Sequence, residues 1–539
     1  MFRMILHGRF CAKCSPLPAP GSLLLTPQAK GVFIRTQSRF VGGNVNFKRR
    51  LKSRTWLYGA GVGIVLAVGL KYRSDSANSS CDDKVEIAQK THPYANAIEV
   101  SRDLLERIKV GKETEVGAPG LIVGVAVDGV QVWSEGIGYA DLENRVPCTP
   151  DTVMRIASIS KSLTTAAAAR LCEEGKLDLD APVQKYVPEF PQKQFDGKDV
   201  TITSRMILSH LSGIRHYEKD AKKVKEDKEK AKRLLRRPDS GTSKQRDDEK
   251  SLPENRGKPG GDQTSKSKES TQAQQKKEFE HEEYYIKGNY ESVIKSLDLF
   301  KNDPLIFKPG TTYLYSTHAF TLLSAVLERA ANQRFLDIMK NMFRELGMHS
   351  TVPDENDPII YHRSRFYHFN KRGRVVNCPY VDVSYKWAGG GFLSTVGDLL
   401  LFGNALLYSY QVAHLKDTEG LLPGFLKPKS AIELWTPVDK TEGTWDNDGL
   451  YGQGWLVVEK LQKYGQCRKR RHYVSHTGGA VGASSVLLVL PSDEMEQHQG
   501  QTLYLPQGVV VTIITNMQSV GLNSTALNIA HQFDKARNV

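Results

Sequence analysis

The sequence predicts an α+β domain in which one antiparallel sheet carries terminal helices and a helical subdomain is inserted between its strands. Three observations support this prediction. Strand-like patterns lie near both ends of the region from about Ala95 to Val539, an amphipathic helix pattern lies outside each group of strands, and the long stretch between the groups has helical pattern. With 40% hydrophobic and 25% charged residues, the composition excludes a collagen-like, coiled-coil or wholly disordered chain.

The first elements of this domain are a helix and a β-hairpin. Apolar residues at helical spacing predict the opening helix, and they are Ile98, Leu104, Leu105 and Ile108. Two apolar runs follow, from 121 to 127 and from 130 to 136, and Asp128-Gly129 joins them. Because Asp-Gly favours the positive φ angles of a two-residue turn, the two runs are predicted to pair as antiparallel strands.

The last elements are four strands and a closing helix. Runs rich in apolar and β-branched residues predict strands over 454–459, 472–475, 483–490 and 509–515. Residues 523–533 predict the closing helix. The sheet is therefore expected to be assembled from both ends of the domain.

The first 74 residues are predicted to be a mitochondrial transit peptide. They contain no acidic residue and 13 of the 74 basic residues of the chain, which is typical of mitochondrial presequences. Residues 55–70 are uncharged and as a helix would span roughly 24 Å, less than the ~30 Å hydrocarbon core. We interpret them as a sorting segment that directs the chain to the intermembrane space, with inner-membrane association, and 75–94 as a linker. The alternative is a matrix presequence with an incidental apolar tail.

Residues 218–283 form a charged insertion in the predicted domain. Its 66 residues carry 19 basic and 16 acidic side chains, so it cannot bury enough apolar surface to offset the entropy of ordering. Residues 219–237 have the composition of a charged helix, and the rest is predicted to be disordered. Since the chain beyond residue 74 carries 61 basic and 60 acidic residues, nucleic acid is not expected as a partner.

The pattern Ser-x-x-Lys occurs three times, beginning at Ser158, Ser265 and Ser292. Only the first opens a strong helix-forming run, which ends near Gly175, so Ser158 and Lys161 are predicted to lie one turn apart on one helix face. A serine hydroxyl needs an adjacent base to become a nucleophile, and a desolvated amine can serve. The alternative for Ser158 is a helix N-cap.

Further motifs follow in order along the chain. They are Ile207-Leu208-Ser209-His210-Leu211-Ser212-Gly213-Ile214, Phe307-Lys308-Pro309-Gly310, Tyr315-Ser316-Thr317, Ala388-Gly389-Gly390-Gly391, Tyr451-Gly452-Gln453-Gly454-Trp455 and His476-Thr477-Gly478-Gly479. With Ser158-x-x-Lys161 they resemble the penicillin-binding-protein family and its class C serine β-lactamases, in which Ser-x-x-Lys is a signature. The resemblance extends from about Ala95 onward and implies a β-lactamase/transpeptidase-like fold. The transit peptide and the charged insertion make the chain similar to mitochondrial members of this family in animals.

The resemblance implies a role for each matching residue. Ser158 is expected to be the nucleophile that forms an acyl-enzyme, and Lys161 its base or proton relay. Tyr315 is expected to pass the proton between Ser158 and the leaving group. The backbone N–H groups of Ser158 and Gly479 would form the oxyanion hole.

Substrate is expected to bind along His476-Thr477-Gly478, where Gly478 would let it lie against the strand edge. The chain departs from the family at two positions. Thr317 replaces an asparagine that orients the lysine and the substrate, and His476 replaces a lysine that faces a substrate carboxylate. Because an unperturbed imidazole loses its charge near pH ~6.5, carboxylate capture by His476 is expected to weaken as the pH rises.

The leading hypothesis is a mitochondrial serine protease that acts on peptide or protein substrates without a cofactor. The resemblance also implies a part in mitochondrial lipid metabolism and assembly into homo-oligomers or filaments. One alternative is a catalytically idle, filament-forming scaffold, which is compatible with the replacement of the family's asparagine by Thr317. The other is an esterase or β-lactamase-type hydrolase. No metal site is predicted, since His472 and His476 on one strand would lie about 13 Å apart, too far to share a zinc ion.

Overall fold

The computed structural model describes residues 93–109, 117–235, 282–462, 469–493 and 506–537, with short gaps at 417, 420, 443–444 and 447. The predicted transit peptide, the sorting segment and most of the charged insertion lie outside the described residues. Among the described helices, none has the length and apolar character needed to span a membrane.

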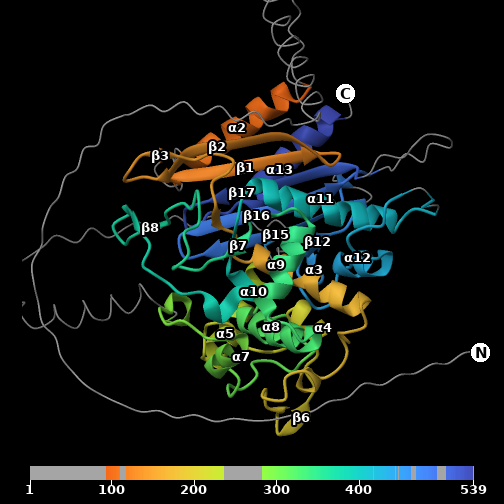
Figure 1. The fold of residues 1–539 in the computed structure, drawn as a ribbon. Helices are drawn as coiled ribbons and strands as arrows, with labels where there is room; N and C mark the ends of the chain where they lie inside the picture. The colour runs from red at the N-terminus through yellow and green to blue at the C-terminus, as the bar shows by residue number, and fades with distance from the viewer. Residues whose placement is uncertain are drawn as a thin grey trace, which may run out of the picture. The chain divides into compact units, whose positions relative to one another are not determined.

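An eight-stranded antiparallel sheet is formed from both ends of the domain (Figure 1). In spatial order its strands are β11 (Leu450–Tyr451), β12 (Leu456–Val458), β15 (Tyr473–Ala480), β16 (Ala483–Pro491), β17 (Gly508–Thr515), β1 (Gly120–Val127), β2 (Val130–Asp141) and β3 (Val146–Pro147). β17 lies beside β1, with Leu121 opposite Thr515. The hairpin turn between β1 and β2 has φ angles of 49° at Asp128 and 80° at Gly129, as the turn type requires. The predicted α+β class is confirmed.

Helices cover both faces of this sheet (Figure 1). The helices next to the sheet are α2 (Ala95–Lys109) and α13 (Asn523–Arg537) on one face and α11 (Val396–Val412) and α3 (Ile159–Glu173) on the other. β1 shows why both faces are covered, because all of its residues are buried. Leu121 and Val123 belong to the core on the α13 side, while Ile122 belongs to the core on the α11 side. Burying apolar side chains on both faces is the main contribution of the sheet to stability.

A helical subdomain lies on the α3 side of the sheet (Figure 1). Its helical elements are η1 (Val183–Lys185), α4 (Ser204–Leu208), α5 (Ala221–Leu235), η2 (Glu282–Tyr285), α7 (Val293–Ser296), η3 (Leu297–Leu299), α8 (Thr317–Ala331), α9 (Phe335–Glu345), η4 (Ser384–Lys386), α10 (Trp387–Gly390) and α12 (Pro428–Leu434). The smaller strands are β4 (Met154–Arg155), β10 (Phe392–Ser394) and β7 (Val352–Pro353) in one sheet, and the pairs β5 (Lys193–Phe195) with β6 (Lys198–Val200), β8 (Tyr367–Phe369) with β9 (Val375–Asn377), and β13 (Leu461–Gln462) with β14 (Lys469–Arg470). Helix α8 packs against α3, α4 and α10, and this packing brings the motifs of the middle segment to the N-terminal end of α3.

Both ends of the charged insertion are ordered. Its first part forms helix α5, in keeping with the helical composition of 219–237. At its other end, Glu283 is buried, forms an ion pair with Arg215 at 2.7 Å and hydrogen-bonds with His318 Nε2 at 2.8 Å. A buried carboxylate needs such partners, so Glu283 is part of the folded domain and not of a disordered segment.

Candidate active site

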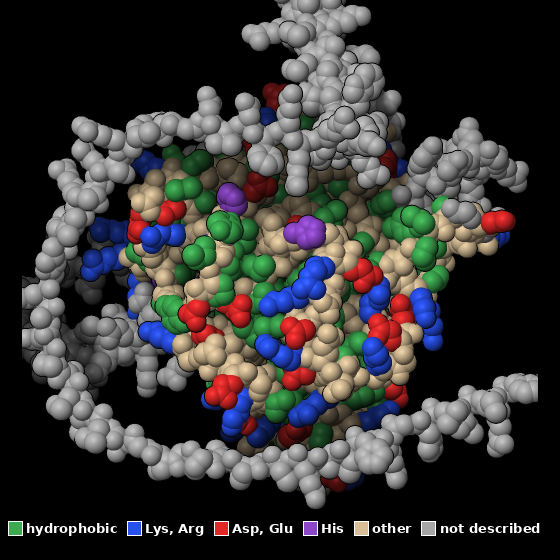
Figure 2. Space-filling model, in the orientation of Figure 1, with side chains coloured by type: hydrophobic (Ala, Val, Ile, Leu, Met, Phe, Trp, Pro, Cys, Tyr) green, Lys and Arg blue, Asp and Glu red, His purple; other side chains and the backbone are tan. Residues whose placement is uncertain are grey.

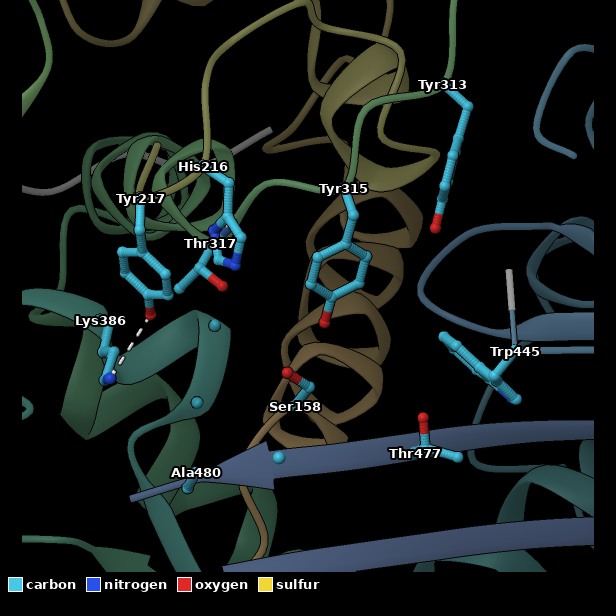
Figure 3. Close-up of a pocket in the computed structure, with 13 residues that line it drawn as sticks. Ser158, His216, Tyr217, Tyr313, Tyr315, Thr317, Lys386, Trp445, Thr477 and Ala480 are labelled. Atoms are coloured by element: carbon cyan, nitrogen blue, oxygen red, sulfur yellow. Dashed lines mark hydrogen bonds between the residues drawn. The ribbon is translucent and has the colours of Figure 1, made fainter. Parts of the chain in front are cut away.

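Ser158 lies at the N-terminal end of α3, in a pocket between the helical subdomain and β15 (Figure 3). The preceding residue, Ala157, has a φ of 49°, which is uncommon for a residue with a Cβ and makes a sharp turn before α3. Ser158 occupies the N-cap position but makes no side-chain capping hydrogen bond. Its Oγ lies 3.1 Å from Lys161 Nζ and hydrogen-bonds with Tyr315. A purely capping role does not account for this geometry.

Lys161 is fully buried in the first turn of α3. Its Nζ lies 3.1 Å from Ser158 Oγ, 3.3 Å from Thr317 Oγ1 and 2.6 Å from the carbonyl oxygen of Gly389. In these contacts Nζ donates to all three oxygen atoms, and once the amine has lost a proton its lone pair can accept the proton of the Ser158 hydroxyl. Burial, and after it the positive charge of Lys386, hold the pKa of Lys161 well below its usual value. Lys161 can therefore act as a base.

Tyr315 precedes α8 and lies over Ser158 (Figure 3). The ring centroid of Tyr315 is 4.7 Å from Lys161 Nζ and 4.3 Å from the centroid of the His210 imidazole. Burial raises the pKa of Tyr315, so its phenol keeps its proton at neutral pH. The two groups beside Ser158 are thus shifted in opposite directions, which is the arrangement expected of a base and an acid in one site.

β15 forms the opposite wall of the pocket (Figure 3). The predicted strand ended earlier, whereas the structure extends it to Ala480. β12 pairs with β15 only over residues 473–475, so the described strands leave the outer edge of 476–480 free. Thr477 and Gly479 line the pocket, and a Cβ on Gly479 would meet no atom within 4 Å. This free edge therefore offers backbone groups next to Ser158.

Gly478 has a different place from the one expected. A Cβ on Gly478 would lie 2.4 Å from the carbonyl oxygen of Ile156 and 3.0 Å from the Cβ of Ala157. Gly478 is buried and lets β15 approach the turn that precedes Ser158. It positions the strand against the nucleophile, and the expected role of giving room to the substrate is not supported.

His476 is fully buried and does not line the pocket. Its Nε2 lies 2.9 Å from the Tyr451 hydroxyl, and its Nδ1 lies 2.7 Å from the carbonyl oxygen of Thr477. Burial, and after it the charge of Lys161, lower the pKa of His476 to about 3, so Nδ1–H donates to Thr477 while Nε2 accepts from Tyr451. The expectation that His476 captures a substrate carboxylate is not met, because both ring nitrogens are engaged and the ring is uncharged.

Thr317 begins α8 and retains a contact with the lysine. Its Oγ1 lies 3.3 Å from Lys161 Nζ, and its side chain also hydrogen-bonds with Tyr217. Its backbone N–H donates to His216 Nδ1 at 3.2 Å. The hydroxyl that replaces asparagine thus still helps to orient Lys161.

The pocket has further lining residues to which the sequence assigned no role. They are His216, Tyr217, Tyr313, Lys386, Trp445 and Ala480. Tyr217 closely follows the His210-containing motif, and Lys386 closely precedes Ala388-Gly389, so adjacency to a motif could have indicated both. Trp445 follows no such signal. The part of the chain that the structure describes contains no group of three His, Cys, Asp or Glu side chains able to hold a metal ion.

Known proteins resemble the chain over most of its length. The Beta-lactamase family model matches residues 104–252 and 257–532. The mouse mitochondrial serine beta-lactamase-like protein LACTB is 58% identical over 457 residues, which cover 82% of this chain and 81% of the relative. The human protein of the same name is 58% identical over 449 residues, with the same coverage of 82% and 81%.

A solved structure supports the same assignment at the level of fold. A class C beta-lactamase mutant matches with a TM-score of 0.52 and 15% identity, over 83% of this chain and 99% of that chain. This likeness shows the β-lactamase/transpeptidase-like fold that the motifs predicted. By its fold, and by the family model that spans most of the domain, the chain belongs to the Beta-lactamase family.

Proposed function

We propose that the chain is a mitochondrial serine hydrolase that cleaves peptide bonds through an acyl-enzyme on Ser158. The observation that carries this proposal is the contact set of Lys161, a buried amine within reach of the Ser158 hydroxyl and of two acceptors that orient it. Such an amine is the type of base that a serine nucleophile requires.

The proposed reaction begins when Lys161 Nζ takes the proton of Ser158 and the Ser158 Oγ attacks the substrate carbonyl carbon. The carbonyl oxygen becomes an oxyanion, which the backbone N–H groups of Ser158 and Gly479 would stabilise. Tyr315 then donates its phenolic proton to the leaving nitrogen, the C–N bond breaks, and the proton on Lys161 restores the phenol. Water attacks the ester in the same way and releases the acyl group, regenerating Ser158.

The location and the assembly of the chain are proposed from the N-terminal sequence and from the resemblance to known proteins. The acid-free, basic first 74 residues and the 58% identity to a protein named as mitochondrial favour mitochondrial import. The apolar segment 55–70 favours the intermembrane space. A part in lipid metabolism and assembly into filaments rest on the family resemblance alone. Protease protection in intact and outer-membrane-ruptured mitochondria tests the location.

Labelling with a fluorophosphonate probe tests the nucleophile, and the chain supplies a matched control. Ser292 begins another Ser-x-x-Lys, but its side chain caps α7 by accepting from the backbone N–H of Lys295. The probe is expected to label the wild type and Ser292→Ala and to leave Ser158→Ala unlabelled. Equal labelling of Ser158→Ala would contradict the proposal.

Matched peptide anilide and ester substrates then separate the two hydrolase alternatives. Cleavage of both by the wild type supports a peptidase, because amides are the harder bond to cleave. Cleavage of the ester alone would favour the esterase reading. An unlabelled, inactive wild type would favour the scaffold.

A further inference from the structure

Two aromatic side chains line one side of the pocket, and the proposed reaction gives them no role. They are Tyr313 and Trp445. Figure 3 shows both of them, with Thr477, on one side of Ser158 and Lys386 on the other side. Tyr313 lies in the segment before α8, and Trp445 lies in the segment before β11. Segments far apart in the chain thus place two rings at the same end of the pocket.

Contacts with neighbouring residues hold both rings in place. The fully buried ring of Tyr451 has its centroid 5.9 Å from that of Tyr313 and 6.2 Å from that of Trp445. The indole Nε1–H of Trp445 donates to Ser475 Oγ at 3.3 Å. Outside the pocket, Lys228 of α5 donates to the backbone carbonyl oxygen of Tyr313. Because rings held in this way have little freedom left to lose, they form a preorganised binding surface.

Trp445 covers the position at which the resemblance expects a lysine. Its ring centroid lies 4.9 Å from that of His476. Trp445 lines the pocket, whereas His476 is fully buried and does not. A substrate on this side therefore meets the indole ring and not the imidazole that it covers.

The side of the pocket that carries the two rings is uncharged. Among the described lining residues, Lys386 is the only lysine, arginine or acidic residue, and it lies on the other side of Ser158 (Figure 3). Burial raises the pKa of Tyr313 well above its usual value, so its phenol keeps its proton. Such a surface favours an aromatic group, because ring contacts add to the area that is buried. It disfavours a charged group, which would lose water without gaining a partner.

Tyr315 identifies this side as the one that receives the leaving group. It lies over Ser158 toward Tyr313 and Trp445 (Figure 3), and in the proposed reaction its phenol protonates the leaving nitrogen. That nitrogen must come within hydrogen-bonding distance of the phenol, and it belongs to the residue that follows the scissile bond. The side chain of that residue would therefore lie against the two rings.

We propose that Tyr313 and Trp445 bind the side chain of the residue that follows the scissile bond, and that this side chain is aromatic. The inference rests on the proposed acyl-enzyme at Ser158 and adds the class of leaving group. A phenylalanine, tyrosine or tryptophan side chain packs against the two rings and displaces water from them. The rings act through binding alone, so the bonds that form and break at Ser158 are unchanged.

The test uses internally quenched peptides that share the acyl sequence of the peptide anilide that the wild type cleaves fastest. They differ only in the residue after the scissile bond, which is phenylalanine, alanine or glutamate, and mass spectrometry verifies the cleaved bond. The wild type is expected to cleave the phenylalanine peptide about tenfold faster than the alanine peptide, measured as kcat/KM. The glutamate peptide is expected to be cleaved no faster than the alanine peptide.

Three variants then test the part of the indole ring. In Trp445→Ala the ratio of the phenylalanine to the alanine peptide is expected to fall about threefold or more, since only Tyr313 remains. Trp445→Phe keeps a ring and is expected to retain most of the wild-type ratio. Tyr361→Ala removes a ring that is 80% exposed and does not line the pocket, and it is expected to keep the full ratio. An unchanged ratio in Trp445→Ala would remove Trp445 from the subsite.

The outcomes separate this inference from the proposed function. A wild-type ratio near one, with both peptides cleaved, would overturn the aromatic subsite and leave Ser158 as the nucleophile. Faster cleavage of the glutamate than of the alanine peptide would also overturn it, because a cation would then have to lie on this side. Failure to cleave any peptide would overturn the peptidase itself. Because the wild-type ratio is itself decisive, a variant that failed to fold would not protect the inference.

Discussion

The two walls of the pocket carry charge differently. One wall is formed by β15 and is here called the strand wall. Its His476 occupies the motif position at which the resemblance expects a lysine, yet the side chain is buried, uncharged and hydrogen-bonded to Tyr451. On the opposite wall, formed by the N-terminal end of α3 and the helical subdomain and here called the helical wall, Lys386 is buried and lines the pocket, while the buried amine of Lys161 lies beside Ser158 as its base. A protonated Lys386 therefore places positive charge at the helical wall of the pocket, whereas the uncharged His476 places none at the strand wall.

The walls also differ in what holds them in place. The strand wall is fixed by continuous pairing of β15 with β16, from Val474 opposite Val489 to Ala480 opposite Ala483. The helical wall is assembled from separate segments, and buried ion pairs such as that of Arg215 with Glu283 join them. The sheet can thus tolerate local changes at its edge, whereas the chemistry of the helical wall depends on long-range contacts.

The largest expected effect concerns the base on the helical wall. Lys161→Met removes the amine beside Ser158, and kcat/KM is expected to fall about 10²- to 10⁴-fold, the usual contribution of a general base. Lys295→Met changes the matching lysine of the Ser-x-x-Lys that begins at Ser292 and is expected to stay near the wild-type rate. Retention of more than a tenth of the activity by Lys161→Met would remove this lysine from the mechanism.

The next effect concerns the support of the helical wall. Glu283→Gln removes one of the two carboxylates that pair with the buried Arg215 and the acceptor of His318, so the free energy of unfolding is expected to fall by about 2 kcal/mol. Chemical denaturation measures this change. Replacing residues 240–278 with a short Gly/Ser linker keeps Glu283 and is expected to cost no more than about 1 kcal/mol. Equal loss in both variants would mean that the insertion itself stabilises the domain.

A smaller effect is expected on the strand wall. His476→Gln weakens the hydrogen bonds to Tyr451 and Thr477, so the free energy of unfolding is expected to fall by about 1–2 kcal/mol. The ratio of kcat/KM for acidic and neutral anilides is expected to stay within about twofold of the wild-type ratio. A large change of that ratio would return carboxylate recognition to the strand wall.

The lowered pKa of His476 also predicts that the free energy of unfolding of the wild type decreases as the pH falls. Its pKa is about 3 in the folded chain and about 6.5 in an unfolded one, so the unfolded state binds the extra proton between these values. The contribution of His476 to stability is therefore complete above pH ~6.5 and is lost as the pH falls toward 3. His476→Gln is expected to have a shallower dependence of unfolding free energy on pH in this window.

The smallest expected effect is a coupling between the two lysines. Activity on a neutral anilide should rise with pH as Lys161 loses its proton, and the nearby charge of Lys386 lowers the pKa of Lys161. Lys386→Met removes that charge, so the rising limb of kcat/KM against pH is expected to move to higher pH. Lys440→Met, which removes the charge of an exposed lysine, serves as the control, and superimposed profiles for Lys386→Met and wild type would show that the two lysines are not coupled.

Most of the sheet could be predicted because its signals are local. The Asp128-Gly129 turn and the apolar runs of β1, β16 and β17 each lie within a few neighbouring residues. The end of β15 could not be predicted, because Gly478 and Gly479 have low strand propensity and are held extended by pairing with Ser485 and Ser484.

The site was predictable to the extent that motifs mark it. The structure brings Ser158, Lys161 and Tyr315 together as the motifs indicated. The importance of Lys386 and Glu283 arises from packing between segments far apart in the chain, and single residues outside a motif give no signal of it. His476 occupied a motif position, but its burial depends on Tyr451 and could not be read from the motif.

Among the described strands, the edge of β15 that has no partner spans residues 476–480, between the end of its pairing with β12 and the turn at Gly482. A peptide that pairs with this edge must be fully extended and must give up any hydrogen bonds of its own over those few residues. A helix or an inner strand of a folded target would first have to open locally, at a cost set by the stability of the target. Susceptibility would then follow the target's own unfolding equilibrium, with tails and frayed ends attacked before any folded core.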